Sequence, residues 1–182
     1  MPTMISKIIL IILFTLMVFN GVYNQYKMQD DIAKQNAFQV VSNFVNNVRT
    51  KGYISPTMIE DFERDLQLGS YLFKTEFKHQ KKVYTPVYTD PTNPASFTGE
   101  YVVDMDEYYK TQIMDYLFEE PNSIPKAERK YLMTEGDFFY VEVQNMTRSN
   151  AMMLFDAFTN NTEGDGVFIF IPNGGMILNE DF

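Results

Sequence analysis

The chain contains the apolar stretch Ile8-Ile9-Leu10-Ile11-Ile12-Leu13-Phe14-Thr15-Leu16-Met17-Val18-Phe19, and a single lysine, Lys7, directly precedes it. Extended outward to Ile5 and Val22, the stretch covers about 18 residues, which at roughly 1.5 Å per residue form a helix about 27 Å long. That length is close to the hydrocarbon thickness of a bilayer. We therefore expect residues 1–25 to anchor the chain in a membrane.

Three interpretations of this stretch compete: a cleaved signal peptide, a retained single-span anchor and a buried core helix. A signal peptide ends in a small-residue cleavage motif, and the following segment, Asn20-Gly21-Val22-Tyr23-Asn24, has none at the required spacing. A core helix of a soluble protein normally has a polar face, whereas Thr15 is the one polar residue in the stretch. The retained anchor is favoured, and cleavage stays open as the alternative.

The orientation of the anchor is less constrained than its existence. Positive residues favour the cytoplasmic side, but Lys7 precedes the stretch while Lys27 and Lys34 follow it. The short N-terminal tail favours a cytoplasmic N-terminus with the large C-terminal portion exported. We expect a single-pass protein of the cell membrane with an extracytoplasmic C-terminal domain. Assembly of this protein into a surface filament is a further hypothesis.

The anchor continues into an amphipathic helix over residues 26–52. Proline is missing between Pro2 and Pro56, and beyond Tyr26 the apolar residues recur at steps of three and four, as on one face of a helix. One helix from about Ile5 to Thr50, ended by Gly52, is predicted. Its apolar stripe provides the candidate helix assembly face, which must be at least partly exposed on the isolated head: Ala33, Ala37, Val41, Phe44 and Val48.

Residues 53–182 are enough for one head domain. Strands that cluster instead of alternating with helices predict an α+β fold, with a long N-terminal helix followed by a small, mostly antiparallel sheet and short helices. The expected helices are one starting at Pro56 with Ser55 as its cap and others at Tyr109–Phe118 and Arg148–Phe158; the expected strands are Tyr71–His79, Val83–Tyr88, Phe97–Met105, Asp137–Val143 and Val167–Ile171; the expected turns are Thr89–Ser96 and Pro172–Gly175.

Composition limits the partners of the head. A net charge of -9 and a pI near 4.6 argue against phosphate neutralisation, so no nucleic acid is expected. Lys74, Lys78 and Lys82 share one face of a strand, which favours a solvated face over an anion site. The 16 Phe and 12 Tyr indicate a packed domain that contains β-structure.

The search for catalytic chemistry finds little. The chain has no cysteine, no G-x-S-x-G and no glycine-rich phosphate loop, and the lone His79 is expected on the surface. Two acidic clusters are better explained as solvated loop or strand faces than as cation sites: Asn161, Glu163 and Asp165, and Asp104, Asp106 and Glu107. For the first cluster, Pro172 stands where a calcium loop needs its bidentate glutamate. Two N-x-[ST] glycosylation matches begin at Asn145 and Asn160. We expect no catalytic, cofactor or metal site, and no enzyme.

An apolar N-terminal run that continues into the amphipathic helix Ala33 to Val48 and then into a small α+β head resembles type IV pilins and pseudopilins, including the tight-adherence pilus group. The resemblance covers residues 5 to 50 as a pattern. It implies that the hydrophobic helix halves lie in the membrane before assembly and in the filament core afterwards. The family usually has Gly before the run, where this chain has Ser6-Lys7. The head, with Gly136-Asp137-Phe138-Phe139, is similar to membrane-anchored proteins of Gram-positive bacteria.

The leading hypothesis is a non-enzymatic, membrane-anchored, pilin-like or minor pilus or secretion-system component. Its partners are the membrane and other copies or pilin-like subunits, which it contacts through its N-terminal helix. The alternative is a membrane-tethered ligand-binding or sensory domain, in which Tyr84, Tyr88, Tyr101 and Tyr109 line a pocket. A tethered hydrolase is the third, least favoured class and requires two convergent carboxylates with perturbed pKa values.

Overall fold

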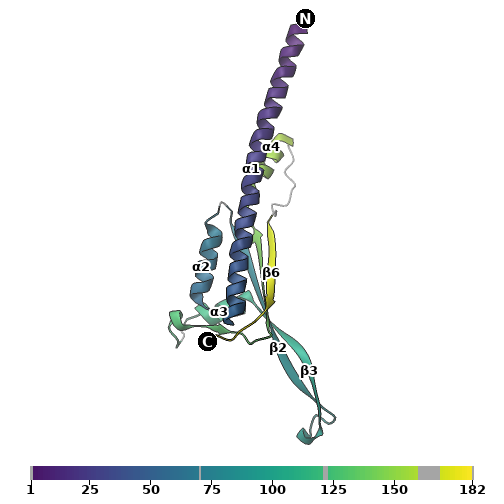
Figure 1. The fold of residues 1–182 in the computed structure, drawn as a ribbon, viewed down its shortest axis with the longest axis vertical. Helices are drawn as coiled ribbons and strands as arrows, with labels where there is room; N and C mark the ends of the chain where they lie inside the picture. Colours follow the sequence, from purple (N-terminus) through teal and green to yellow (C-terminus); the bar gives the residue numbers. More distant parts are fainter. Residues whose placement is uncertain (1, 70, 121–122, 160–168, 182) are drawn as a thin grey trace.

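The computed structural model describes residues 2–69, 71–120, 123–159 and 169–181. Its elements are α1 (Pro2–Lys51), β1 (Tyr53–Ile54), α2 (Pro56–Gln67), β2 (Phe73–Tyr88), the 3-10 turn η1 (Pro94–Ser96), β3 (Phe97–Tyr109), α3 (Lys110–Phe118), the 3-10 turn η2 (Lys126–Glu128), β4 (Tyr131–Leu132), β5 (Phe138–Asn145), α4 (Asn150–Thr159) and β6 (Phe170–Met176). The fold is α+β, as predicted: a long N-terminal helix is followed by antiparallel sheets and short helices (Figure 1).

The predicted long helix is confirmed as α1, and the C-terminal segment of the chain completes its end. Gly52 adopts a φ of 72° and donates its N–H to the Val48 carbonyl over 2.8 Å. Two of the last helical carbonyls, those of Arg49 and Lys51, accept the backbone N–H groups of Leu178 and Asp181. These bonds satisfy acceptors that a helix end leaves free, so the chain's last residues fix the lower end of α1.

The main sheet has the strand order β3-β2-β5-β6, and all its neighbours are antiparallel. β2 is one strand of 16 residues, so the two separate strands predicted here are wrong. Its first part, Phe73–Gln80, pairs with β5, and its second part, Lys78–Tyr88, pairs with β3. The second part leaves the sheet as a two-stranded arm that points away from the N-terminus (Figure 1). Pro86 fits because β2 has no second neighbour there.

The predicted turn at Pro172–Gly175 is wrong, since these residues belong to edge strand β6. Its glycines are needed for close approach: a Cβ on Gly174 would lie 2.4 Å from the Tyr140 ring, and one on Gly175 would lie 2.7 Å from the Arg49 guanidinium. The Arg49 side chain also donates to the Met176 carbonyl over 2.9 Å. The lower half of α1 is thereby bonded to β6.

The core lies between the lower half of α1, α2 and one face of the sheet. Phe44 stacks on Phe62 of α2 with ring centroids 4.3 Å apart, and it contacts Phe77 and Phe139 of the sheet. The cap predicted for α2 is confirmed, because the Ser55 hydroxyl accepts the Met58 N–H over 3.3 Å. Aromatic packing of this kind gives the head a fixed position on α1.

Candidate functional site

The upper half of α1 carries the predicted anchor, and its apolar side chains are exposed except where α4 contacts Phe19 and Tyr23. Large apolar side chains from Met4 to Val18 are between 46% and 76% exposed. The helix is long and apolar enough to cross a membrane, and none of its most apolar window is buried in the protein. The core-helix interpretation of Ile8 to Phe19 is therefore wrong. This half of α1 presents an apolar surface on all sides.

The predicted assembly face occupies a different environment from the one expected. Ala37, Val41, Phe44 and Val48 are buried, and Ala33 is partly buried against the same core. The exposure expected of this face is therefore wrong, because the head uses the stripe for its own core. A stripe of this kind has the same sequence pattern whether it packs on its own domain or on another subunit.

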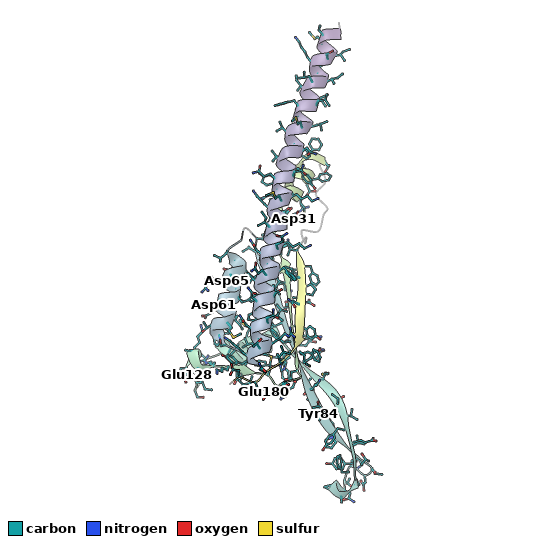
Figure 2. The ribbon with its side chains drawn as sticks, viewed as in Figure 1. Asp31, Asp61, Asp65, Tyr84, Glu128 and Glu180 are labelled. Atoms are coloured by element: carbon teal, nitrogen blue, oxygen red, sulfur yellow. The ribbon has the colours of Figure 1, made fainter. Side chains whose placement is uncertain are left out.

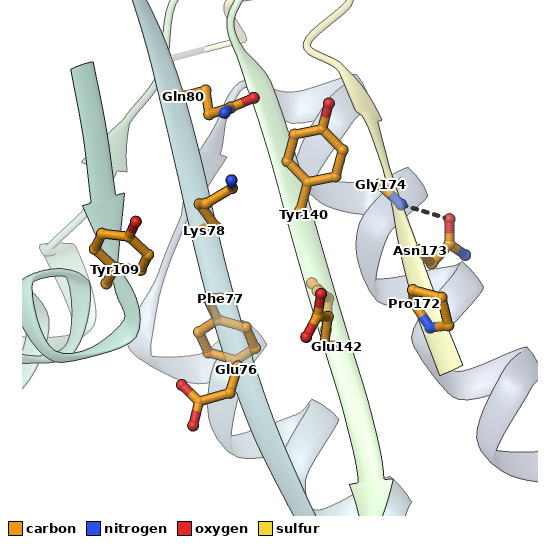
Figure 3. Close-up of a pocket in the computed structure, with 11 residues that line it drawn as sticks. Glu76, Phe77, Lys78, Gln80, Tyr109, Tyr140, Glu142, Pro172, Asn173 and Gly174 are labelled. Carbon is orange, nitrogen blue, oxygen red and sulfur yellow. Dashed lines mark hydrogen bonds between the residues drawn. The ribbon is translucent and has the colours of Figure 1, made fainter. Parts of the chain in front are cut away.

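The solvent face of the sheet forms an open trough across β3, β2, β5 and β6 (Figure 3). The trough has a volume of about 790 Å³. The Lys78 ammonium lies 5.8 Å from the centre of the Tyr140 ring at its middle, and the Lys82 ammonium lies 5.6 Å from the Phe138 ring further along the same face. The shared, solvated lysine face predicted on this strand is thus confirmed, with aromatic rings beside two of its members.

Glu107 is held at the edge of this trough by three donors. The Tyr109 hydroxyl lies 2.6 Å from one carboxylate oxygen, and the Gln80 amide and Lys78 ammonium lie 2.7 and 3.2 Å from the other. These hydrogen bonds lower the pKa of Glu107 to about 2, and the bond from the Tyr109 hydroxyl makes the largest contribution. The Glu107 carboxylate in turn raises the pKa of Tyr109. A carboxylate with so low a pKa is a poor general acid or base at neutral pH. The group serves as a clamp between strands.

The arm has one apolar face, defined by the pairing of β2 with β3. Alternate residues point to the same side of a strand, and the register places Tyr84 opposite Val103 and Pro86 opposite Tyr101. Phe97 joins them, with its ring centroid 5.3 Å from that of Tyr101. We call this set the aromatic stripe, and Figure 2 labels Tyr84 within it. Its members, exposed except for the half-buried Pro86, are Tyr84, Pro86, Tyr88, Phe97, Tyr101, Val103 and Met105.

The four tyrosines expected to share one pocket are divided between these two surfaces. Tyr109 lines the trough. Tyr84, Tyr88 and Tyr101 lie in the aromatic stripe and do not line the trough, so the expectation of one shared pocket is wrong for these three. The sequence did not reveal the separation because it depends on how far β2 extends beyond β5.

His79 is buried, so the prediction of a surface residue is wrong. Its Nδ1 lies 2.9 Å from the Tyr131 hydroxyl and its Nε2 lies 3.1 Å from the Asp137 carboxylate. That carboxylate also accepts the N–H groups of Lys82 and Thr134. Burial lowers the pKa of His79 although Asp137 opposes the shift, and burial raises the pKa of Tyr131. The cluster joins the base of the arm to the loop before β5.

A sequence signal for this burial existed. His79 has the same parity along β2 as the inward-facing Thr75 and Phe77. Weighting that alternation above the surrounding lysines identifies the residue as a core position.

The acidic clusters do not converge. Asp104 and Asp106 share one face of β3, whereas Glu107 points to the other, so these residues do not form the single face that was expected. Among the described residues, no group of three His, Cys, Asp or Glu could hold a metal ion. Asn161, Glu163, Asp165 and the N-x-[ST] match at Asn160 lie outside the described residues.

The other glycosylation match is a structural asparagine. The side chain of Asn145 is buried, donates to the Thr147 carbonyl over 2.7 Å and accepts the Ile169 N–H over 2.8 Å. These bonds join the end of β5 to the start of the last strand region. The amide that a glycan would need is therefore committed to the fold.

The described features define an α+β head on a long helix whose upper half is long and apolar enough to span a membrane. Comparison with protein-family models, with curated proteins and with solved structures finds no match for this chain.

Proposed function

We propose that this chain is a non-enzymatic, single-span membrane protein of pilin-like type, which assembles with other copies or related subunits through the upper half of α1. The observation that carries the proposal is the division of α1. Its lower half is the core of the head, while its upper half leaves the head with apolar side chains on every side. This arrangement is also what the resemblance to type IV pilins and pseudopilins implies.

The exposed upper half requires an apolar environment. Each large apolar side chain that stays in water forgoes roughly 1.5 to 3 kcal/mol of burial free energy. A bilayer supplies that environment before assembly, and the same surface on neighbouring helices supplies it afterwards, since helix packing and lipid contact are close in free energy. The assembly surface is therefore moved from the Ala33 to Val48 stripe to residues 5–22.

In the orientation we propose, the N-terminus is cytoplasmic and the head is extracytoplasmic. The arm points away from the N-terminal end of α1 (Figure 1). The aromatic stripe is then displayed far from the lipid, where subunits of a pilus or secretion system meet the surroundings of the cell.

Cysteine crosslinking tests the assembly, because the chain contains no cysteine of its own. Leu10→Cys and Met17→Cys should give disulfide-linked dimers in intact membranes, since both side chains are exposed on α1. Val41→Cys is the matched control on the same helix, and its burial should prevent crosslinking. Scanning the whole stretch from residue 8 to 19 without finding a linked position would refute assembly through this surface.

Labelling with an impermeant thiol reagent tests the orientation. Thr89→Cys, exposed at the tip of the arm, should react in intact cells. Val45→Cys is buried in the head and should react only after denaturation. Labelling of Thr89→Cys that requires cell lysis would reverse the orientation.

A ligand-binding or sensory head is the second candidate, and the trough on the sheet favours it. The combination of Tyr140, Lys78 and Glu142 suits a small molecule with aromatic and charged groups. A compound extracted from the denatured wild-type protein, and missing from Tyr140→Ala, would support this function in mass spectrometry. If both extracts are the same, the trough has no retained ligand.

A further inference from the structure

Helix α4 is apolar on nearly all sides and yet uncovered. Seven of its ten residues are apolar: Ala151, Met152, Met153, Leu154, Phe155, Ala157 and Phe158. Of these only Ala151 is buried, while Met153, Phe155 and Phe158 are 48%, 48% and 56% exposed. Helices that are apolar all round are normally enclosed by protein or lipid. The described residues cover Ala151 and part of Met152 and Leu154, and they leave about half of the Met153, Phe155 and Phe158 side chains exposed.

The position of α4 along α1 indicates what covers these side chains. The Phe158 ring lies 4.4 Å from Phe19 and the Phe155 ring lies 6.2 Å from Tyr23. Later residues of α4 thus meet earlier residues of α1, so that α4 runs antiparallel to α1 and toward its N-terminal end. Figure 1 shows α4 beside α1 above the sheet, between the head and the free end of the helix.

The contact reaches into the segment that we propose spans the membrane. A hydrocarbon layer about 30 Å thick that starts at Ile5 extends roughly 20 residues along α1, to about Gln25. Measured along the helix, Phe19 then lies about 9 Å inside the layer and Tyr23 about 3 Å inside it. The exposed end of α4 therefore lies at the same depth as lipid tails on the side of the head.

Charges around α4 are compatible with immersion in this region. Its one acidic residue, Asp156, lies between Phe155 and Phe158, in the half of α4 nearer the N-terminus of α1. The Asp156 carboxylate is paired with the Arg148 guanidinium at 2.6 Å and its side chain is only 17% exposed, so this half of the helix carries no uncompensated charge. The next charged residue of α1 beyond Tyr23 is the exposed Lys27. The one after it, Asp30, is buried and accepts a hydrogen bond from the Tyr71 hydroxyl. Because α4 has no basic residue, apolar insertion is its means of binding, and anionic lipid is not required.

We propose that α4 is a second membrane-contacting element, which inserts beside α1 into the lipid on the side of the head and seats the head on the bilayer surface. This proposal rests on the proposed anchoring by α1. Because the lower half of α1 is already part of the core of the head, a second inserted helix limits the tilt of the whole molecule in the bilayer, and the arm is held at a fixed angle and distance from the membrane.

Tryptophan fluorescence tests the proposal in the full chain, which contains no native tryptophan. Phe158→Trp would be reconstituted in phosphatidylcholine vesicles with and without bromine atoms on the lipid tails. We expect its emission to be shifted to shorter wavelength and to be largely quenched by bromines partway down the tails, at the depth of about 9 Å given above for Phe19. Phe155→Trp, one turn earlier, is the second probe and should be quenched less. Circular dichroism checks that each variant is folded.

Two further single-tryptophan variants separate this proposal from the anchoring itself. Phe14→Trp in the upper half of α1 should be quenched best by deep bromines, and Tyr84→Trp on the arm should not be quenched. Quenching at position 14 without quenching at 158 and 155 overturns the role of α4 and leaves the anchor intact. If position 14 is not quenched, both proposals fail.

A second copy of the chain is the competing occupant of the α4 surface. In that case Phe158→Trp would emit at short wavelength without quenching by brominated lipid, and the shift would decline as the protein is diluted into excess lipid. This result would overturn insertion and replace it with contact between subunits.

Discussion

The two halves of α1 are built from the same continuous helix but have opposite surfaces. The upper half is apolar and exposed except where α4 contacts Phe19 and Tyr23, whereas the lower half has one apolar stripe that the head buries completely at Val41 and Val48. The change falls near Asp30, the first buried polar residue along the helix. The difference shows that the continuity of a helix and its environment are separate properties. Continuity fixes the position of one half relative to the other, whereas the side chains determine whether each half needs lipid, protein or water around it.

Continuity joins the two environments mechanically. At roughly 1.5 Å per residue, the 50 residues of α1 extend about 75 Å. No proline interrupts α1 after Pro2, and its lower end is bonded to the last residues of the chain. A displacement of the upper half of α1 therefore moves the head with it.

The largest expected effect comes from removing an aromatic ring from each half. Phe44→Ala deletes a ring that stacks on Phe62 and contacts Phe139, and it should lower the free energy of unfolding of the head by about 3 to 5 kcal/mol. Phe14→Ala, matched in chemistry and 65% exposed, should leave that free energy unchanged. Urea unfolding in detergent micelles measures both. Equal losses would contradict the division of the helix.

The two glycines of the helix region give the next contrast. Gly52→Ala places a Cβ 2.2 Å from the Asn179 carbonyl oxygen at a φ of 72°, and the backbone strain alone costs on the order of 1 to 3 kcal/mol. Gly21→Ala meets no atom within 4 Å and should be neutral for the head while favouring the helix. Thermal unfolding compares them. A tolerated Gly52→Ala would mean that the C-terminal segment does not cap α1.

Features set by local sequence were predictable. The apolar stretch, the period of three and four beyond it and the missing proline determine α1. Ser55 followed by Pro56 determines the start of α2. The inward face of β2 follows from the alternation of Thr75 and Phe77. Each of these depends on residues that are neighbours in the chain.

Features set by distant residues were not predictable. Pro172–Gly175 is typical of a turn, but Gly174 and Gly175 are small because Tyr140 and Arg49 approach them from other elements. The alternation of β2 indicates that His79 points inward, but the partner that accepts its hydrogen bond, Asp137, lies 58 residues later and could not be predicted. The predicted assembly stripe was correctly identified as apolar, yet a sequence does not say whether its partner is its own head or a second subunit.

A smaller effect should follow from removing the cap that starts α2 just below the end of α1. Ser55→Ala leaves the Met58 N–H without its acceptor and should cost about 1 kcal/mol. Ser55→Asp, which retains an acceptor, is the matched control and should restore most of the loss. The free energy of unfolding of the head, measured in urea, should fall by this amount. The yield of crosslinking through the upper half of α1 should not change. Altered crosslinking would show that the two halves are energetically coupled.

The smallest effect is a pH dependence that belongs to the head alone. Because burial lowers the pKa of His79 below its ordinary value of 6.5, the unfolded chain binds a proton there more readily than the native head does. The contribution to stability is therefore complete above about pH 6.5 and declines as the pH falls toward the lower native pKa. The Asp137 carboxylate opposes the shift, which keeps the effect small. His79→Gln should flatten the fall in unfolding free energy between about pH 7 and pH 5.5. The upper half of α1 contains no histidine, so tryptophan quenching at position 14 should not change over this range. An identical pH profile for wild type and His79→Gln would mean that the histidine is not held neutral, and the buried cluster at the base of the arm would need a different account.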